Sequence, residues 1–106
     1  MERYVVTTRL KPGAKRAAEE LLSQGPPFDP GDAGLSAHAA YLDGDRVFLV
    51  FEGDEAREKA FALGDQHADE VTRWQELVWE LPAVVADVPQ AARCVYRWPE
   101  PAPATR

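Results

Sequence analysis

LSAHAAYLDGDRVFLVFE (residues 35–52) is typical of a β-hairpin. The central triplet Asp43-Gly44-Asp45 is a tight-turn signal, because aspartate and glycine tolerate the backbone conformations that short hairpin turns require. Side chains alternate between the two faces of a strand, and in the second arm both faces are apolar. One face carries Phe48 and Val50, and the other carries Val47, Leu49 and Phe51. A strand of this kind needs a cover on each side.

The rest of the chain predicts further strands and two helical regions around this hairpin. Strands are predicted at residues 4–10, 35–42, 47–52 and 93–98, and helices at residues 14–24 and 55–80. Asp54 is expected to cap the second helix, and Gly64 to break or kink it so that two helices at an angle are equally compatible with the pattern. Residues 82–92 contain two prolines and are expected to be irregular.

The order β-α-β-β-α-β is the ferredoxin-like arrangement, an α+β fold. It predicts a four-stranded antiparallel sheet with both helices on one face, because each βαβ crossover is right-handed. The helices shelter only that face, so the other apolar face is expected to pack against a second copy of the chain or to close on a ligand. The sequence therefore predicts a homodimer formed through the sheet.

Length and composition indicate one globular domain over residues 1–98, followed by a Pro- and Ala-rich tail, residues 99–106, that is expected to be disordered. Of the 106 residues, 45% are hydrophobic and 28% charged, as in ordinary soluble proteins. A net charge of -6 argues against nucleic acid and anionic membranes as partners. The N-terminus enters a strand at once, which leaves no room for a signal peptide, and Cys94 is the only cysteine, so we expect a cytoplasmic protein without disulfides.

Three patterns resemble the dimeric α/β-barrel superfamily, and within it the antibiotic-biosynthesis-monooxygenase-like branch. They are Leu10-Lys11-Pro12-Gly13 leading into an acidic helix, the hairpin end Phe51-Glu52-Gly53 and the closing strand Tyr96-Arg97-Trp98. The resemblance covers roughly residues 3–98. It implies two ferredoxin-like sheets joined face to face into a barrel, with monooxygenase- or cyclase-like chemistry or none. Oxygenase members commonly carry an Asn on the first strand, whereas this chain has no Asn and places Thr7, Thr8 and Arg9 there.

His38 is the candidate catalytic residue. It lies in the first arm of the hairpin among alanines, whose small side chains leave room for a ligand or for larger side chains of a partner. Imidazole titrates near neutral pH and can act as a general acid or base. The alternative is a buried structural histidine whose hydrogen bond is satisfied within the fold.

Four further residues are candidates for ligand binding: Thr8, Tyr41, Phe28 and Trp74. Aromatic side chains can flank a flat apolar molecule, although such residues are more often part of a core or an interface. Phe28 is the only large apolar residue in the Pro- and Gly-rich stretch 24–34. That stretch is interpreted either as a surface connection pinned by one aromatic residue or as a lid over a pocket.

Together these residues favour a protein that binds or transforms a small hydrophobic or aromatic molecule, with no metal and no bound cofactor expected. The alternative is a non-catalytic dimeric assembly or regulatory module whose sheet face is filled by side chains. A third interpretation is a haem-dependent oxygenase that uses His67, since the haem-degrading members of the superfamily hold iron with a histidine on the second helix. The acidic neighbours of His67 favour a solvated helix face instead.

Overall fold

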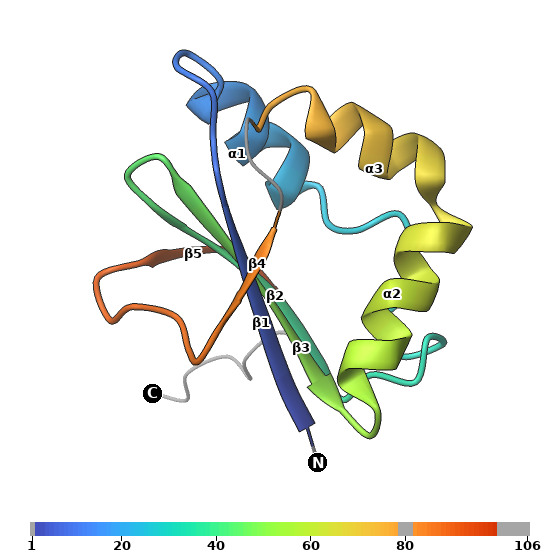
Figure 1. The fold of residues 1–106 in the computed structure, drawn as a ribbon. Helices are drawn as coiled ribbons and strands as arrows, with labels where there is room; N and C mark the ends of the chain where they lie inside the picture. Colours follow the sequence, from blue (N-terminus) through green and yellow to red (C-terminus); the bar gives the residue numbers. More distant parts are fainter. Residues whose placement is uncertain (1, 79–81, 100–106) are drawn as a thin grey trace, which may run out of the picture.

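The computed structural model describes residues 2–78 and 82–99, which form one antiparallel sheet with three helices on one side (Figure 1). The strand order is β4-β1-β3-β2-β5. In chain order the elements are β1 (Glu2–Arg9), α1 (Lys15–Ser23), β2 (Ala37–Asp43), β3 (Arg46–Gly53), α2 (Ala56–Gln66), α3 (Ala68–Gln75), β4 (Ala83–Val85) and β5 (Arg93–Trp98).

The predicted four-stranded ferredoxin-like sheet is wrong, because the sheet has five strands and three helices accompany it. The additional strand is β4, which lies within the stretch that the sequence predicts to be irregular. It pairs with β1, where Val5 faces Val85 and Thr7 faces Ala83. The predicted last strand is β5, and it pairs with β2 at the opposite edge of the sheet. A strand of three residues is too short to show an alternating pattern, and its partner lies far away along the chain.

The predicted hairpin is confirmed as β2 and β3. Leu42 faces Val47 and Asp43 faces Arg46 in the register of the two strands. Gly44 adopts a φ of 62° in the turn, a left-handed conformation that glycine reaches without steric cost. The hairpin register sets which side chains of β3 face the helices, and thereby positions the site described below.

The second helical region consists of two helices, as one of the two interpretations of its sequence expects. The break falls at His67, which has φ -121° and ψ 45°, whereas Gly64 lies inside α2. The prediction of Asp54 as N-cap is wrong, because Glu55 holds the cap position in a left-handed conformation without a side-chain cap. Glycine weakens a helix by only about 1 kcal/mol, a cost that the packing of α2 against β1 and β3 can offset.

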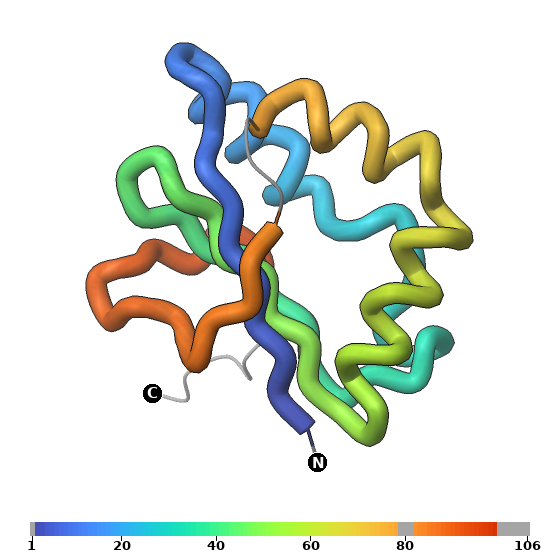
Figure 2. The backbone as a smooth tube through the Cα atoms, viewed as in Figure 1, coloured from blue at the N-terminus to red at the C-terminus, as the bar shows by residue number. Residues whose placement is uncertain are grey.

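The face of the sheet away from the helices is covered within the chain. β4 and β5 lie at opposite edges, so the segment between them, residues 86–92, crosses this face; we call it the strap (Figure 2). Val88 in the strap packs against a buried cluster of Val5, Ala39 and Val50. The expectation that only a second copy or a ligand can cover this face is therefore wrong, while the homodimer itself stays a prediction.

Ion pairs on β1 hold the strap in place. The Arg3 guanidinium lies 2.7 Å from Asp87 Oδ1 in the strap and 3.2 Å from Glu52 Oε1 on β3. Asp87 Oδ1 also accepts a hydrogen bond from the Val88 backbone N–H at 2.7 Å. These contacts fix the strap where its apolar residue meets the sheet.

The C-terminal tail and the location of the protein are also predicted from the sequence. The predicted tail, residues 99–106, lies outside the described residues except for Pro99. Among the helices of the described ranges, none combines the length and the hydrophobicity that crossing a bilayer demands. The cytoplasmic location stays a prediction.

Candidate functional site

Two clusters of buried residues lie at opposite ends of the helix-facing side of the sheet. The first cluster contains Leu10, Ala14, Ala18, Leu42, Val47 and Val78. The second cluster contains Tyr4, Leu35, Phe51, Ala56 and Leu63. Leu49 packs against both of them, because it lies between Val47 and Phe51 on the same face of β3.

Between the clusters, three apolar side chains form a row across the sheet. Val84 on β4 faces Val6 on β1, which in turn faces Leu49 on β3, and directly opposed residues share a face. Val47 is 0% exposed and Phe51 9%, whereas Val6 and Leu49 are only half-buried and Val84 is 64% exposed. We call Val6, Leu49 and Val84 the mid-sheet patch. On β4, β1 and β3 the middle of this face is thus covered less completely than its two ends, whereas Ala40 on β2, which faces Leu49, is buried.

Two predicted ligand-binding residues lie on either side of this patch, each against one of the two clusters. Trp74 on α3 is half-buried against the first cluster. Phe28, in the loop of residues 24–34, is half-buried against the second cluster. Because Leu49 packs against both clusters, the two aromatic side chains lie on either side of the patch.

The other two predicted ligand-binding residues do not join them in one place. Thr8 is buried on the helix-facing side, opposite Val47 and therefore at the end of the sheet that α1 covers. Tyr41 packs on the strap-covered face, against the cluster of Val5, Ala39 and Val50. Tyr41 therefore cannot act in the same site as His38, whose side chain points to the helices.

His38 is buried among aromatic rings. It is 5% exposed, and its ring centroid lies 4.6 Å from Phe51, 5.5 Å from Phe28 and 5.8 Å from Tyr96. The small alanines beside it thus leave room for aromatic side chains of the same chain. This environment agrees with the interpretation of His38 as a structural histidine.

The tautomer of neutral His38 follows from its hydrogen bond. Nδ1 lies 2.8 Å from the Val50 carbonyl oxygen, which can only accept, so Nδ1 carries the proton and Nε2 is left as an acceptor. Burial lowers the pKa of His38 below the usual value, and the hydrogen bond to Val50 opposes this only in part. His38 is thereby held neutral.

The loop of residues 24–34 is pinned by Phe28. The Phe28 ring lies 5.5 Å from the His38 ring and 5.9 Å from the His67 ring at the junction of α2 and α3. The sequence suggests His38 as a catalytic residue and His67 as a haem ligand, which are separate roles. Nothing in the spacing of the two histidines shows that one phenylalanine contacts both. The lid interpretation of this loop stays a prediction.

No metal site is formed by the described residues. Within residues 2–78 and 82–99, no three His, Cys, Asp or Glu side chains are placed so that they could hold a metal ion. His67 is half-buried, and the ring that contacts it is that of Phe28. A haem-dependent role for His67 stays a prediction without a supporting contact in this structure.

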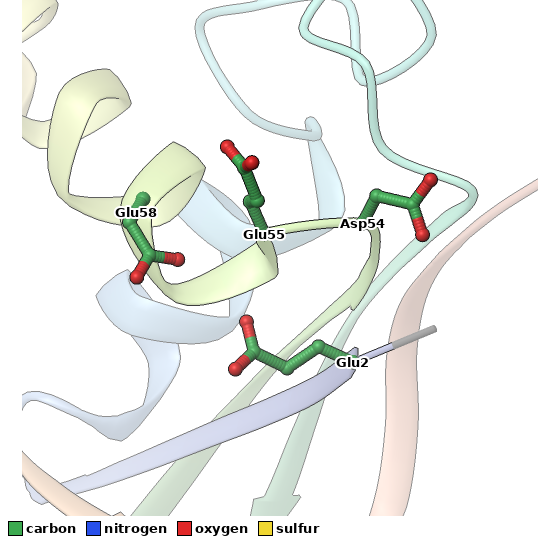
Figure 3. A pocket seen from close by; sticks show the side chains of 4 residues that line it. All are labelled: Glu2, Asp54, Glu55 and Glu58. Carbon is green, nitrogen blue, oxygen red and sulfur yellow. The ribbon is translucent and has the colours of Figure 1, made fainter.

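An open depression lies at the start of α2, lined by Glu2, Asp54, Glu55 and Glu58 (Figure 3). Sequence reasoning missed it, since Glu2 comes from the other end of the chain. Its carboxylates point in different directions, and Glu2 Oε1 accepts a hydrogen bond from the Arg57 backbone N–H at 2.9 Å. The depression therefore gathers negative charge, but its carboxylates do not converge on one point.

No family model, no curated protein and no solved structure matches this chain. The resemblance to the dimeric α/β-barrel superfamily therefore stays a prediction from sequence patterns.

Proposed function

We propose that this protein binds a small apolar or aromatic molecule on the mid-sheet patch. The observation that carries the proposal is the partial exposure of Val6 and Leu49 in the middle of a sheet whose ends are buried on the same side. Apolar side chains at the centre of a sheet are normally covered by other groups. Phe28 and Trp74 provide aromatic side chains on either side of a ligand that would cover this patch.

The energetics favour an apolar occupant. Each methylene-sized group that a ligand removes from water on this patch contributes about 0.8 kcal/mol, before the cost of immobilising the ligand. The row of Val84, Val6 and Leu49 consists of aliphatic side chains only, so it offers no charged group to a ligand. A neutral, flat and mainly hydrocarbon molecule suits it best.

The geometry supports binding more directly than a particular reaction. The polar candidates are dispersed, because His38 lies under Phe28, Thr8 lies in the first-cluster end of the sheet and Tyr41 lies on the other face. Monooxygenase- or cyclase-like chemistry stays a prediction that rests on the sequence resemblance.

Titration with indole, observed through the methyl resonances of the protein by NMR, tests the proposal. We expect saturable shifts at the methyls of Val6, Leu49 and Val84. Val84→Asp should weaken indole binding by about fivefold, since it places a charge at the exposed end of the patch. Val71→Asp is the matched control, because Val71 is also exposed but lies on α3.

Two results would contradict the proposal. One is the absence of saturable shifts at the patch while indole, and naphthalene as a second probe, are taken to their solubility limits. The other is an equal loss of affinity in Val84→Asp and Val71→Asp, which would place the binding elsewhere on the surface.

A second candidate function is a non-catalytic dimeric assembly or regulatory module. Val84 favours it, because a large apolar side chain that is exposed on an edge strand promotes contact with another chain. In sedimentation velocity at micromolar concentration, such a module gives a dimer that Val84→Asp dissociates. A monomer at every concentration would contradict this candidate and leave the ligand proposal intact.

A further inference from the structure

Phe61 on α2 extends the apolar surface of the mid-sheet patch along β1. Its side chain is 56% exposed, and its ring centroid lies 6.1 Å from that of Tyr4. Tyr4 and Val6 are two residues apart on β1, so their side chains share the helix-facing side of the sheet. Val84 lies opposite Val6. An apolar row therefore runs from Val84 over Val6 and Tyr4 to Phe61, and both of its ends are exposed.

The flank of α2 that carries Phe61 has open space beside it. Near the start of α2, the Arg57 backbone N–H donates to Glu2 Oε1 on β1. One turn later, Phe61 contacts the residue two positions further along β1, so α2 and β1 run in the same direction. Gly64 follows on the same flank, and a Cβ atom there would meet no atom of the described residues within 4 Å. The glycine thus leaves room for a ligand next to Phe61.

Negative charge surrounds the Phe61 end of this row. The depression at the start of α2 is lined by Glu2, Asp54, Glu55 and Glu58 (Figure 3). Arg57 lies among them, and its guanidinium carbon is 5.5 Å from the centroid of the Phe61 ring, over the ring face. Carboxylates outnumber the guanidinium here, and the whole chain has a net charge of the same sign, -6.

We propose that the ligand of the mid-sheet patch is a cationic amphiphile whose ammonium group lies between Phe61 and the carboxylates of Glu2 and Glu58. The inference rests on the proposed function and names the chemical class of its ligand. The apolar row binds the body of the molecule, which is hydrocarbon and neutral where it covers the patch. The charge around the Phe61 end determines the sign of the other end of the molecule.

The spacing along β1 suits such a molecule. Val6 and Glu2 are four residues apart, which is about 13 Å along a strand. The glutamate side chains bridge part of this distance, so a ring with a flexible chain of a few methylenes brings its ammonium group within reach.

The chemistry of this end of the row favours an ammonium group over other groups. Carboxylates accept charge-assisted hydrogen bonds from it, and the contact with Arg57 shows that the face of Phe61 accepts a cation. The carboxylates need not converge, because an exposed ammonium group completes its hydrogen bonds with water. An anionic ligand would be repelled here, and a second copy of the chain would bring its own net charge of -6.

Three ligands with one body and different charges test the inference. They are 4-phenylbutylamine, 4-phenylbutanol and 4-phenylbutanoate, titrated at low ionic strength and followed through the methyl resonances of Val6, Leu49 and Val84. We expect the amine to bind about fivefold more tightly than the alcohol, as exposed ion pairs allow at most, and the carboxylate to bind most weakly. The advantage of the amine should shrink at high salt, which screens exposed charges.

A double substitution locates the effect of charge. Glu2→Gln with Glu58→Gln removes two charges and keeps an oxygen at residue 2 that can accept from the Arg57 N–H. It should lower the affinity for the amine to that for the alcohol. Glu20→Gln with Asp43→Asn is the matched control, because it removes two charges on α1 and at the hairpin end of β2. This control should retain the advantage of the amine.

The orientation of the bound amine in the wild-type protein decides the matter even if these variants do not fold. We expect nuclear Overhauser effects from the methylene next to the ammonium group to the Phe61 ring, and from the phenyl ring to the methyls of Val6 and Val84. The reverse orientation would overturn the proposal.

Failure of the charge argument and failure of the patch give different results. Equal affinities of amine and alcohol, with shifts at the patch, would overturn the cationic ligand and leave the patch as a site for neutral molecules. An equal loss of the amine's advantage in both double variants would also overturn it, because it indicates attraction by the net charge alone. The absence of saturable shifts at the patch with all three ligands would contradict the proposed function as well.

Discussion

Protonation of His38 destabilises the folded protein, because the buried imidazole loses the hydration that its charged form has in water. Its pKa in the folded protein is lowered below the value of about 6.5 in the unfolded chain. Between these two values the unfolded state binds more protons than the folded state, so the free energy of unfolding falls as the pH falls. Below the folded pKa both states are protonated and the loss is complete.

Urea unfolding at a series of pH values should show a free energy of unfolding that decreases below about pH 6.5 with a slope of at most about 1.4 kcal/mol per pH unit from His38. In His38→Leu this contribution to the slope should be absent, while His67→Asn should retain it. Equal slopes in wild type and His38→Leu would show that His38 is not the group responsible.

Asp87 provides a second titration that is separated from that of His38. The Arg3 guanidinium, which donates to Asp87, and the hydrogen bond from the Val88 N–H lower the pKa of this carboxyl below 3.8. A lowered carboxyl pKa contributes stability that is present above the unfolded value and lost as the pH falls through the folded one. Acid unfolding that involves the strap therefore sets in at a lower pH than the His38 transition.

The sequence predicts some properties of single residues in the candidate site, but not all of their contacts. His38 could be placed on a strand among small neighbours, and Phe28 could be recognised as the anchor of its loop, because both properties are local. The register that puts Tyr41 on the other face also follows from alternation along β2. The contact of Phe28 with both His38 and His67 depends on how the helices end, and no local pattern encodes it.

Two glycines should respond to alanine in opposite directions. Gly44 has a positive φ in the hairpin turn, so Gly44→Ala should lower the free energy of unfolding by about 1 kcal/mol. Gly64 lies inside α2, and a Cβ atom there would meet nothing within 4 Å. Gly64→Ala should therefore raise the free energy of unfolding by about 0.5–1 kcal/mol, since alanine is the better helix former.

Urea unfolding of the two variants measures both effects in one series. Stabilisation by Gly64→Ala would support α2 as a helix that continues through residue 64 to the break at His67. Destabilisation by Gly64→Ala would instead place the break at the glycine, as the sequence pattern alone suggests. No loss of stability in Gly44→Ala would contradict the turn conformation.

The helices and strands that the sequence predicts are those set by residues close together in the chain. The hairpin follows from a turn triplet between two alternating runs, and α1 follows from one amphipathic stripe. β4 could not be predicted, because its three residues become a strand only through pairing with β1. The strap follows from β4, since a strand beside β1 and another beside β2 oblige the chain to cross the sheet between them.

The strap should contribute measurably to stability. Val88 is half-buried against the sheet, so Val88→Ser should lower the free energy of unfolding by about 1 kcal/mol. Val71→Ser, an equivalent change of a more exposed valine on α3, should alter it by no more than about 0.5 kcal/mol. Equal effects of the two substitutions would mean that the strap does not cover the sheet in solution.

The whole molecule has one apolar sheet with two differently closed faces. One face is closed by the strap, which brings Val5 and Val50 to 1% and 2% exposure without a second chain. The other is closed by helices at its ends and less completely in its middle, where the patch of Val6, Leu49 and Val84 lies. A homodimer could therefore form through either face, but the two routes have opposite responses to substitution.

Sedimentation velocity of Val88→Asp and Val84→Asp distinguishes the routes. If copies associate through the strap-covered face, Val88→Asp should strengthen association, because a charge in the strap displaces it from the apolar cluster that it covers. If they associate through the mid-sheet patch, Val84→Asp should dissociate them, because the same charge then lies in the interface. We expect the second response, since the patch is accessible without any rearrangement, whereas the strap-covered face becomes available only when the contacts of Arg3 with Asp87 and of Val88 with the sheet are broken.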